Sequence, residues 1–389
     1  MCGSSPSVRQ ASARGHPFLM GRMLDIFKAT VSFFRRRRIH RESFLFRLHY
    51  NVTTVILLTF CMIVGVNQFV KNPIICNSQM IPRDILDTYC WTHSTFSVIA
   101  AFKKQIGVEV PYPGVDTMRR DTPVRTQRYY QWVFLCLMLQ AILFYLPGWL
   151  WSNWEGGKLK KLRMDLDIGF ISSTDKSEKK KRLLEYLEQN RHNHNIWTYK
   201  YFFCEFLTLV NVFGQMFLMN TFLDGEFLSF GARVLQFMES DEEDRADPMI
   251  AMFPRVTKCT FHRYSPSGNV ERHDSICVLP LNIINEKIYV FLWFWCLGLF
   301  VSSLGLMLYR SLLIVSPKLR HVVFTTRYRA IRRDCAELLA RQSELGDWFL
   351  YYMLGGNLDN VIFRDVMHEH AQRLRYCSQG SRTELTDCL

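Results

Sequence analysis

Four long apolar blocks constrain this 389-residue chain more strongly than any other feature of its sequence. The blocks are residues 52–70, 130–151, 201–222 and 288–315. Each is long enough, at about 1.5 Å per helical residue, to cross a hydrocarbon layer of about 30 Å. Their only Asp, Glu, Lys or Arg residues are Glu205 in the third block and Arg310 near the end of the fourth. The sequence therefore predicts four transmembrane helices.

The composition fits a folded membrane protein. Hydrophobic residues make up 49% of the chain and aromatic residues 14%, which excludes intrinsic disorder. Because most of this apolar mass is concentrated in four blocks, an ordinary soluble enzyme is excluded as well. Residues 1–22 lack the continuous apolar stretch of a cleaved signal peptide, so we expect the first helix to act as its own insertion signal.

Basic residues predict the orientation of the helices, because Lys and Arg are retained on the cytoplasmic side of a membrane. The two ends of the chain and the loop between the second and third helices together hold 32 basic residues, whereas the other two loops hold 15. We therefore expect both termini and the middle loop to lie in the cytoplasm. We attribute the net charge of +13 to this topology and to lipid contact instead of nucleic-acid binding.

This topology divides the chain into segments. A disordered N-terminal extension is predicted at 1–22, an amphipathic cytoplasmic segment at 23–49, a cytoplasmic loop at 152–199 and a helical cytoplasmic tail at 316–389. The transmembrane helices are predicted at 50–70, 129–151, 200–222 and 288–315, and the extracellular loops at 71–128 and 223–287.

The cysteines of the two predicted extracellular loops favour disulfide bonds. Cys76 and Cys90 lie in the first loop, and Cys259 and Cys277 lie in the second. Exposed thiols oxidise outside the cell, so four free thiols are disfavoured. Four cysteines allow three connectivities, and their spacing does not choose among them.

A run of residues at the start of the second predicted helix is typical of one protein family. The run is Tyr129, Tyr130, Gln131, Trp132 and Val133, and the same helix contains Pro147. With it, the chain resembles the innexins over roughly residues 23–374. Further matches to that family are Phe46-Arg-Leu-His-Tyr50, Tyr89-Cys-Trp-Thr-His93, Gly214-Gln-Met-Phe-Leu-Met-Asn220, Leu279-Pro-Leu-Asn282 and Gly346-Asp-Trp-Phe-Leu350.

The innexin resemblance implies a function and an architecture. It implies a plasma-membrane channel subunit that forms gap junctions by docking with a channel of the neighbouring cell, and that also opens undocked as a hemichannel. The implied fold is an all-α membrane protein with four transmembrane helices, two disulfide-linked extracellular loops of small strand content and a cytoplasmic helical domain. Its expected partners are the bilayer and other innexin subunits, of the same or related chains, in a ring of eight. The implied disulfides join Cys76 to Cys277 and Cys90 to Cys259.

A polar stripe on the first span has two interpretations. Small or polar side chains recur on one helical face at Asn51, Thr54, Cys61 and Gln68. They either line the pore or let neighbouring helices approach closely. Glu205 begins a second stripe on the third span, where it either faces the pore or reaches the membrane interface or a basic partner.

An amphipathic helix is predicted before the first span. Leu24 and Phe27 belong to its apolar face, whereas Asp25 and Lys28 belong to the opposite face. It either lies on the cytoplasmic membrane surface or, as the resemblance implies, folds into the pore mouth and lines it with Leu24, Asp25 and Lys28. The 22 preceding residues exceed the usual length of the family at this end, and their bulk must fit in or near that mouth.

Motifs for other chemistry are absent from the sequence. His192 and His194 form a His-x-His pair, as do His368 and His370, but no His-Glu-x-x-His box or Gly-x-Ser-x-Gly elbow accompanies them. We expect no catalytic residue, metal site or cofactor. The competing hypothesis is a four-span adhesion or scaffold protein without a pore.

Overall fold

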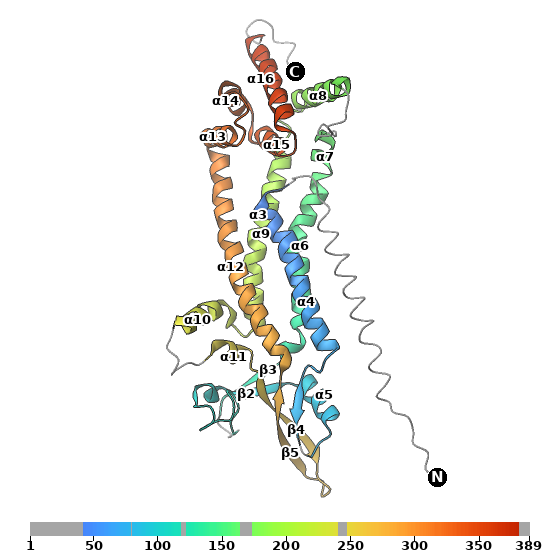
Figure 1. Ribbon diagram of the computed structural model, residues 1–389, viewed down its shortest axis with the longest axis vertical. Coiled ribbons are helices and arrows are strands. Elements are labelled where there is room, and N and C mark those ends of the chain that lie inside the picture. Colours follow the sequence, from blue (N-terminus) through green and yellow to red (C-terminus); the bar gives the residue numbers. More distant parts are fainter. Residues whose placement is uncertain (1–41, 79, 118–121, 164–172, 240–246, 381–389) are drawn as a thin grey trace, which may run out of the picture. The chain divides into compact units, whose positions relative to one another are not determined.

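The computed structural model describes residues 42–78, 80–117, 122–163, 173–239 and 247–380 (Figure 1). The predicted extension at 1–22 lies outside the described residues. Most of the predicted amphipathic segment, including Leu24, Asp25 and Lys28, lies outside them too.

Four helices in the described part of the chain are long and apolar enough to cross a membrane, which confirms the four predicted spans. The first span combines α3 (Phe44–Arg47), a π-helical turn (Leu48–Val52) and α4 (Thr53–Phe69). The other spans are the helices α6 (Val133–Glu155), α9 (Asn195–Phe222) and α12 (Pro280–Val315).

All four spans begin at other residues than the sequence predicts, because they start at Phe44, Val133, Asn195 and Pro280 instead of residues 50, 129, 200 and 288. A short 3₁₀ turn occupies Tyr129–Gln131, so α6 starts only at Val133. By contrast, α12 starts at Pro280 instead of residue 288, because proline at a first helical position lacks only an N–H that would have no helical partner. Its 36 residues give a length of about 54 Å, which exceeds the thickness of the hydrocarbon layer.

Two compact units make up the chain, and each includes parts of all four long helices. Within the described residues, unit 1 comprises 52–144 and 211–300, whereas unit 2 comprises 42–51, 145–210 and 301–380.

Unit 1 contains a five-stranded antiparallel sheet with the strand order β1-β5-β4-β2-β3 (Figure 1). The strands are β1 (Ile75–Asn77), β2 (Thr95–Val98), β3 (Val124–Gln127), β4 (Val256–Tyr264) and β5 (Val270–Val278). The longest two form a hairpin whose register runs from the Val256 and Val278 pair to the Tyr264 and Val270 pair. The sheet combines both predicted extracellular loops, because β1, β2 and β3 come from the first and the hairpin comes from the second.

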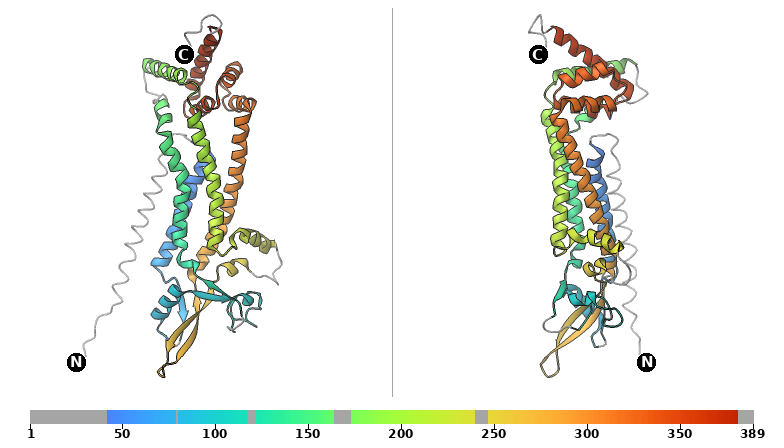
Figure 2. Two further views of the ribbon diagram at one scale, coloured as in Figure 1. Left: turned by 180° about the vertical axis from the view of Figure 1, so that it is seen from behind. Right: turned by 90° about the vertical axis from the view of Figure 1, so that its left-hand side faces the viewer.

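A helix of the first loop packs beside this hairpin. It is α5 (Arg83–His93), which lies next to β4 in the views of Figure 2. The rings of Tyr89 and Phe261 meet edge to face with 4.8 Å between centroids. Leu86 and Cys90 on the same helix are buried, so α5 presents an apolar face to the sheet.

Aromatic rings connect the remaining helices of unit 1, α10 (Phe227–Glu239) and α11 (Pro248–Met252), to α12. Phe253 directly follows α11, and its ring contacts three other rings. The distances between ring centroids are 5.3 Å to Tyr289, 5.5 Å to Tyr129 and 6.1 Å to Phe230. The indole of Trp293 donates to the carbonyl of Leu228 at 3.2 Å. These contacts hold α10 and α11 against the first half of α12.

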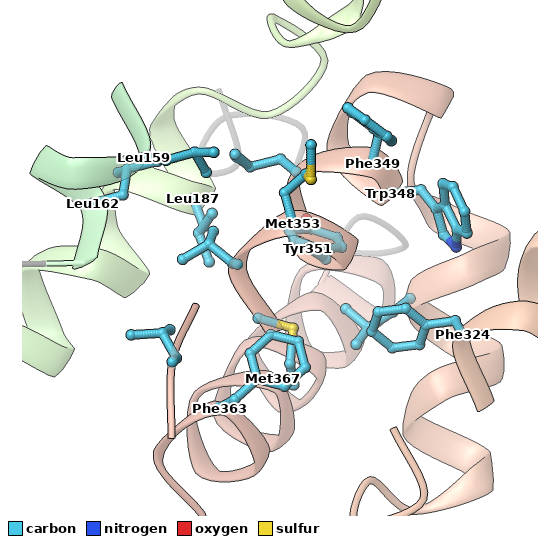
Figure 3. Packing of buried hydrophobic residues seen from close by; sticks show 14 of the residues in the cluster. Leu159, Leu162, Leu187, Phe324, Trp348, Phe349, Tyr351, Met353, Phe363 and Met367 are labelled. Atoms are coloured by element: carbon cyan, nitrogen blue, oxygen red, sulfur yellow. The ribbon is translucent and has the colours of Figure 1, made fainter. Parts of the chain in front are cut away.

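Unit 2 is a helical assembly around a large apolar core (Figure 3). Its helices besides the long ones are α7 (Lys158–Arg163), α8 (Ser173–Gln189), α13 (Pro317–Arg327), α14 (Arg333–Gln342), α15 (Leu345–Gly355) and α16 (Asn360–Gly380). Leu159 and Leu187 face the side chains of α15 and α16 in this core. Nearly every residue of α15 is buried, so this helix is surrounded by the others.

A glycine permits the close approach of α15 to the start of α9. The Gly346 N–H donates to Asn195 Oδ1 at 2.8 Å, and a Cβ at residue 346 would overlap the backbone of His194 and Asn195. Backbone cannot yield as a flexible side chain can, so only glycine fits this position.

We expect Gly346→Ala to destabilise the protein by about 1–3 kcal/mol through this overlap, and to lower the thermal unfolding midpoint of the full chain in detergent. Gly305→Ala is the matched control, because a Cβ at Gly305 would meet no atom within 4 Å. Equal midpoints for the two variants would contradict the proposed role of the glycine.

Candidate functional site

Two disulfide bonds tie the two predicted extracellular loops together. Cys76 on β1 bonds to Cys277 on β5, and Cys90 on α5 bonds to Cys259 on β4. This is the pairing that the family resemblance implies. The bonds span 201 and 169 residues of sequence, and each stabilises by about 4–5 kcal/mol in a chain-entropy estimate for such long loops. All four cysteines are buried, so the disulfides that connect the β4–β5 hairpin to β1 and α5 lie in the protein interior.

The Tyr-Tyr-Gln-Trp-Val run holds the disulfide-bearing helix α5 against the start of α6. The Tyr130 hydroxyl donates to the carbonyl of Cys90 at 3.2 Å, and its ring lies 4.8 Å from that of Trp91. Gln131 donates to the carbonyls of Trp91 and Thr92. The run therefore connects a candidate membrane span to the loop that contains α5.

The chemistry of Tyr130 suits this connection. Burial raises the pKa of Tyr130 to about 12, so its hydroxyl stays protonated and remains a donor at physiological pH. Tyr129 beside it is also buried, whereas Trp132 is more than half exposed. The sequence singled out this run through its resemblance, but only the structure gives these contacts.

The polar stripe of the first span faces α6 in the part of the span that belongs to unit 1. Thr54 Oγ1 donates to the carbonyl of Ala141 at 3.4 Å. Cys61 Sγ contacts the carbonyl of Phe134 at 3.6 Å. Gln68 Nε2 donates to the carbonyl of Gln131 at 3.3 Å. These contacts match the helix-packing interpretation of the stripe. Asn51 precedes α4 within the π-helical turn of unit 2.

The other faces of α4 carry two further polar side chains. Thr59 donates to the carbonyl of Val55 at 2.7 Å, and Asn67 donates to that of Ile63 at 2.8 Å. Because both groups are satisfied within their own helix, they need no polar partner elsewhere in the chain. Ile63, between them, is 41% exposed.

A buried ion pair joins α9 to α12 in unit 2. The Arg310 guanidinium donates from Nε to Glu205 Oε2 at 2.7 Å and from Nη2 to Glu205 Oε1 at 3.0 Å. The Glu205 side chain is fully buried, and that of Arg310 is 7% exposed. The basic partner of Glu205 is thus Arg310, in agreement with one interpretation of the second stripe.

The start of the first span is attached to the same ion pair. The Ser43 hydroxyl donates to Glu205 Oε1 at 2.9 Å, and the Ser43 backbone N–H donates to the Tyr201 hydroxyl at 2.7 Å. Further along the span, His49 Nε2 lies 2.5 Å from the Ser303 hydroxyl. Ser43 gives no distinctive signal in the sequence, so its contacts were missed.

Among the described residues, one group of side chains has the types and spacing of a metal site. It consists of Cys76, Cys90 and Cys277, whose sulfurs lie within 4.8 Å of one another. All three are engaged in disulfides and have no thiolate to offer a metal. The arrangement therefore acts as a covalent brace for the loops.

Comparison with known proteins assigns the whole described chain to one family. The family model described as Innexin matches residues 42–374. Innexin shaking-B of Drosophila melanogaster is 52% identical over 354 residues, which cover 90% of this chain and 95% of that protein. Innexin inx1 of Schistocerca americana is 44% identical over 360 residues, which cover 92% of this chain and all of that protein. Innexin inx2 of Drosophila melanogaster is 42% identical and covers 90% of this chain and 96% of its own length.

We expect Glu205→Gln to lower stability by about 3–5 kcal/mol, because it leaves the Arg310 charge buried without its partner. The measurement is the thermal unfolding midpoint of the full chain in detergent. Glu337→Gln serves as the control, since Glu337 pairs with Arg341 at 2.6 Å on an exposed surface and such pairs contribute at most about 1 kcal/mol. Similar losses in both variants would show that burial does not govern the Glu205 pair.

Proposed function

The chain belongs to the innexin family, and we propose that it assembles as a ring of eight subunits around an aqueous pore and docks through its disulfide-bonded loops. Innexins form gap junction channels, so the chain is a membrane channel subunit and not an enzyme. The alternative of a scaffold without a pore is not favoured.

The covalently braced hairpin carries the docking proposal. Its strands are linked to β1 and α5 by the two disulfides, so its tip is held at a defined distance from the helices. Tyr264 and Val270 at the tip are 76% and 63% exposed. An ion pair between Arg263 and Glu271 at 3.2 Å stiffens the strands beside them. A rigid hairpin with an exposed aromatic tip suits contact with a second protein surface.

The proposed orientation puts the two disulfide-bonded loops outside the cell and both termini inside it. Two arguments support this orientation. Basic residues are concentrated in the termini and the middle loop, and stable disulfides belong to an oxidising compartment. The helical assembly around α15 then lies in the cytoplasm.

The proposed pore surface has two parts. The first is the amphipathic segment with Leu24, Asp25 and Lys28, placed at the cytoplasmic mouth by its polar face. The second is the side of α4 that carries Thr59 and Asn67. Thr54, Cys61 and Gln68 are already engaged with α6, so the remaining polar side chains of α4 are those available to face water or a neighbouring subunit.

We expect Cys90→Ser and Cys259→Ser each to abolish electrical coupling between paired cells, because either change releases the hairpin from α5. Coupling is measured as junctional conductance, and surface labelling establishes that the variants reach the plasma membrane. Cys335→Ser is the control, since Cys335 is a half-buried free thiol in unit 2. Non-reducing peptide mapping that joined Cys76 to Cys90 would contradict the disulfide pairing.

The tip variant Tyr264→Ala separates docking from folding. It removes an exposed ring and leaves both disulfides in place, so undocked channels should keep their current while coupling falls. Coupling at the level of the unaltered chain would exclude the hairpin tip from the docking surface.

We further expect the 22 residues before Met23 to reduce conductance and cation preference, because Arg9, Arg14 and Arg22 add positive charge at the cytoplasmic mouth within a screening length of about 10 Å. The test compares undocked currents of the full chain and of a shortened chain that starts at Met23, each with and without Asp25→Asn. The shortened chain should conduct more, and Asp25→Asn should weaken cation selectivity in both. Four identical currents would place the segment on the membrane surface instead.

A further inference from the structure

A cavity of about 420 Å³ lies in unit 2 where the first span begins. Its wall includes Ser43 and Arg47 of the first span, Arg310 of α12, Arg327 at the end of α13, and Tyr352 with Gly356 at the end of α15. The cavity has the size of an ordinary small-molecule site, not that of a packing defect. Three of the residues in its wall are arginines that come from three different helices.

Arg310 presents a donor that the ion pair leaves unused. Its Nε and Nη2 both donate to Glu205, and its Nη1 has no hydrogen-bond partner among the described residues. The residue is 6% exposed and belongs to the cavity wall. Glu205 thus holds the guanidinium in a fixed orientation, with one N–H edge remaining for a bound acceptor.

The other two arginines have no carboxylate partner in the part of the chain that the structure describes. Arg47 is half-buried, whereas Arg327 is exposed and lies over the ring of Tyr352 with 4.8 Å between its guanidinium carbon and the ring centroid. Stacking on an aromatic face fixes the plane of a guanidinium and leaves its N–H groups available to an anion.

The charges in the cavity wall favour a ligand with a single negative charge. The described wall holds three guanidinium groups and the carboxylate of Glu42, which accepts from the Tyr50 hydroxyl at 2.5 Å. The Glu205 carboxylate, outside the wall, pairs with Arg310. One positive charge therefore remains in excess. Arginine clusters match the planar arrays of oxygens on phosphate groups, which accept several N–H bonds at once.

We propose that this cavity binds the phosphate group of an anionic molecule, with Arg47, Arg310 and Arg327 as its donors. The site lies where the first candidate span begins and near the end of the fourth, and phospholipid headgroups are expected at the ends of membrane spans. Phe44 in the same wall is 76% exposed and offers an apolar surface beside the charged one. A lipid headgroup and a soluble phosphate share the required chemistry, so the experiment must distinguish these two sources.

The experiment measures thermal unfolding midpoints of the full chain in neutral detergent. One arm adds phosphatidylglycerol in mixed micelles against phosphatidylcholine, and the other adds inorganic phosphate against chloride at equal ionic strength. Ligand binding to the folded state raises the midpoint in a concentration-dependent manner, from which an apparent affinity follows. A response to phosphatidylglycerol alone assigns the site to a lipid headgroup, whereas a response to inorganic phosphate assigns it to a soluble phosphate.

Arg327→Gln should weaken the apparent affinity about tenfold, the usual effect of losing one charge-assisted hydrogen bond. Arg329→Gln is the matched control, because Arg329 is exposed, carries the same charge two residues away and does not line the cavity. Gly356→Phe is a second test. The end of α15 has a negative φ that accepts a side chain, and a Cβ there would make only ordinary contacts, so the ring would fill the cavity and abolish binding.

Two results would overturn the proposal. The first is no shift of the midpoint with either phosphatidylglycerol or inorganic phosphate. The second is an equal loss of affinity in Arg327→Gln and Arg329→Gln together with unchanged binding in Gly356→Phe, which would reduce the effect to unspecific charge attraction.

Discussion

Polar side chains within a hydrocarbon layer must find their partners inside the protein, and this constraint determines which faces of the long helices meet. In unit 2, Arg310 and Glu205 satisfy each other across α12 and α9. In unit 1, the Trp295 indole donates to Thr53 at 3.0 Å, and Thr54 reaches a carbonyl of α6. Each contact selects one rotation of a helix about its axis. Apolar contact alone would not select it, because lipid tails are as apolar as leucine.

A different physical interaction fixes the two loops that form the sheet. They have no membrane to confine them, and the two disulfides remove chain entropy from segments nearly 200 residues apart. The hydrogen bonds of Tyr130 and Gln131 to carbonyls of α5 then fix these loops to the start of α6. The loops are consequently held against the start of the second span, and a docking surface requires such fixation if its geometry is to be reproducible.

The spans could be predicted from the sequence because their signal is length and lack of charge, which the membrane imposes on every residue of a block. The role of the first-span stripe could not, since water and a neighbouring helix both favour small or polar side chains at Thr54 and Cys61. The sequence located Glu205 and Arg310 but could not pair them, because 105 residues separate them. The sequence around Gly346 does not show why glycine is required there. The requirement comes from the backbone of Asn195, which is far away in the sequence but close in space.

Ser43 links the two proposals that concern the start of the first span. It donates to Glu205 and Tyr201, and it also belongs to the wall of the arginine-lined cavity. The segment 23–49, proposed to form the pore mouth, therefore contains a residue that is fixed to the ion pair. An anion in the cavity would touch this anchor through Arg310, and it would act on the first residues of the span without entering the pore. Energetic coupling between a bound phosphate group and the first residues of the span would involve the contact of Ser43 with Glu205.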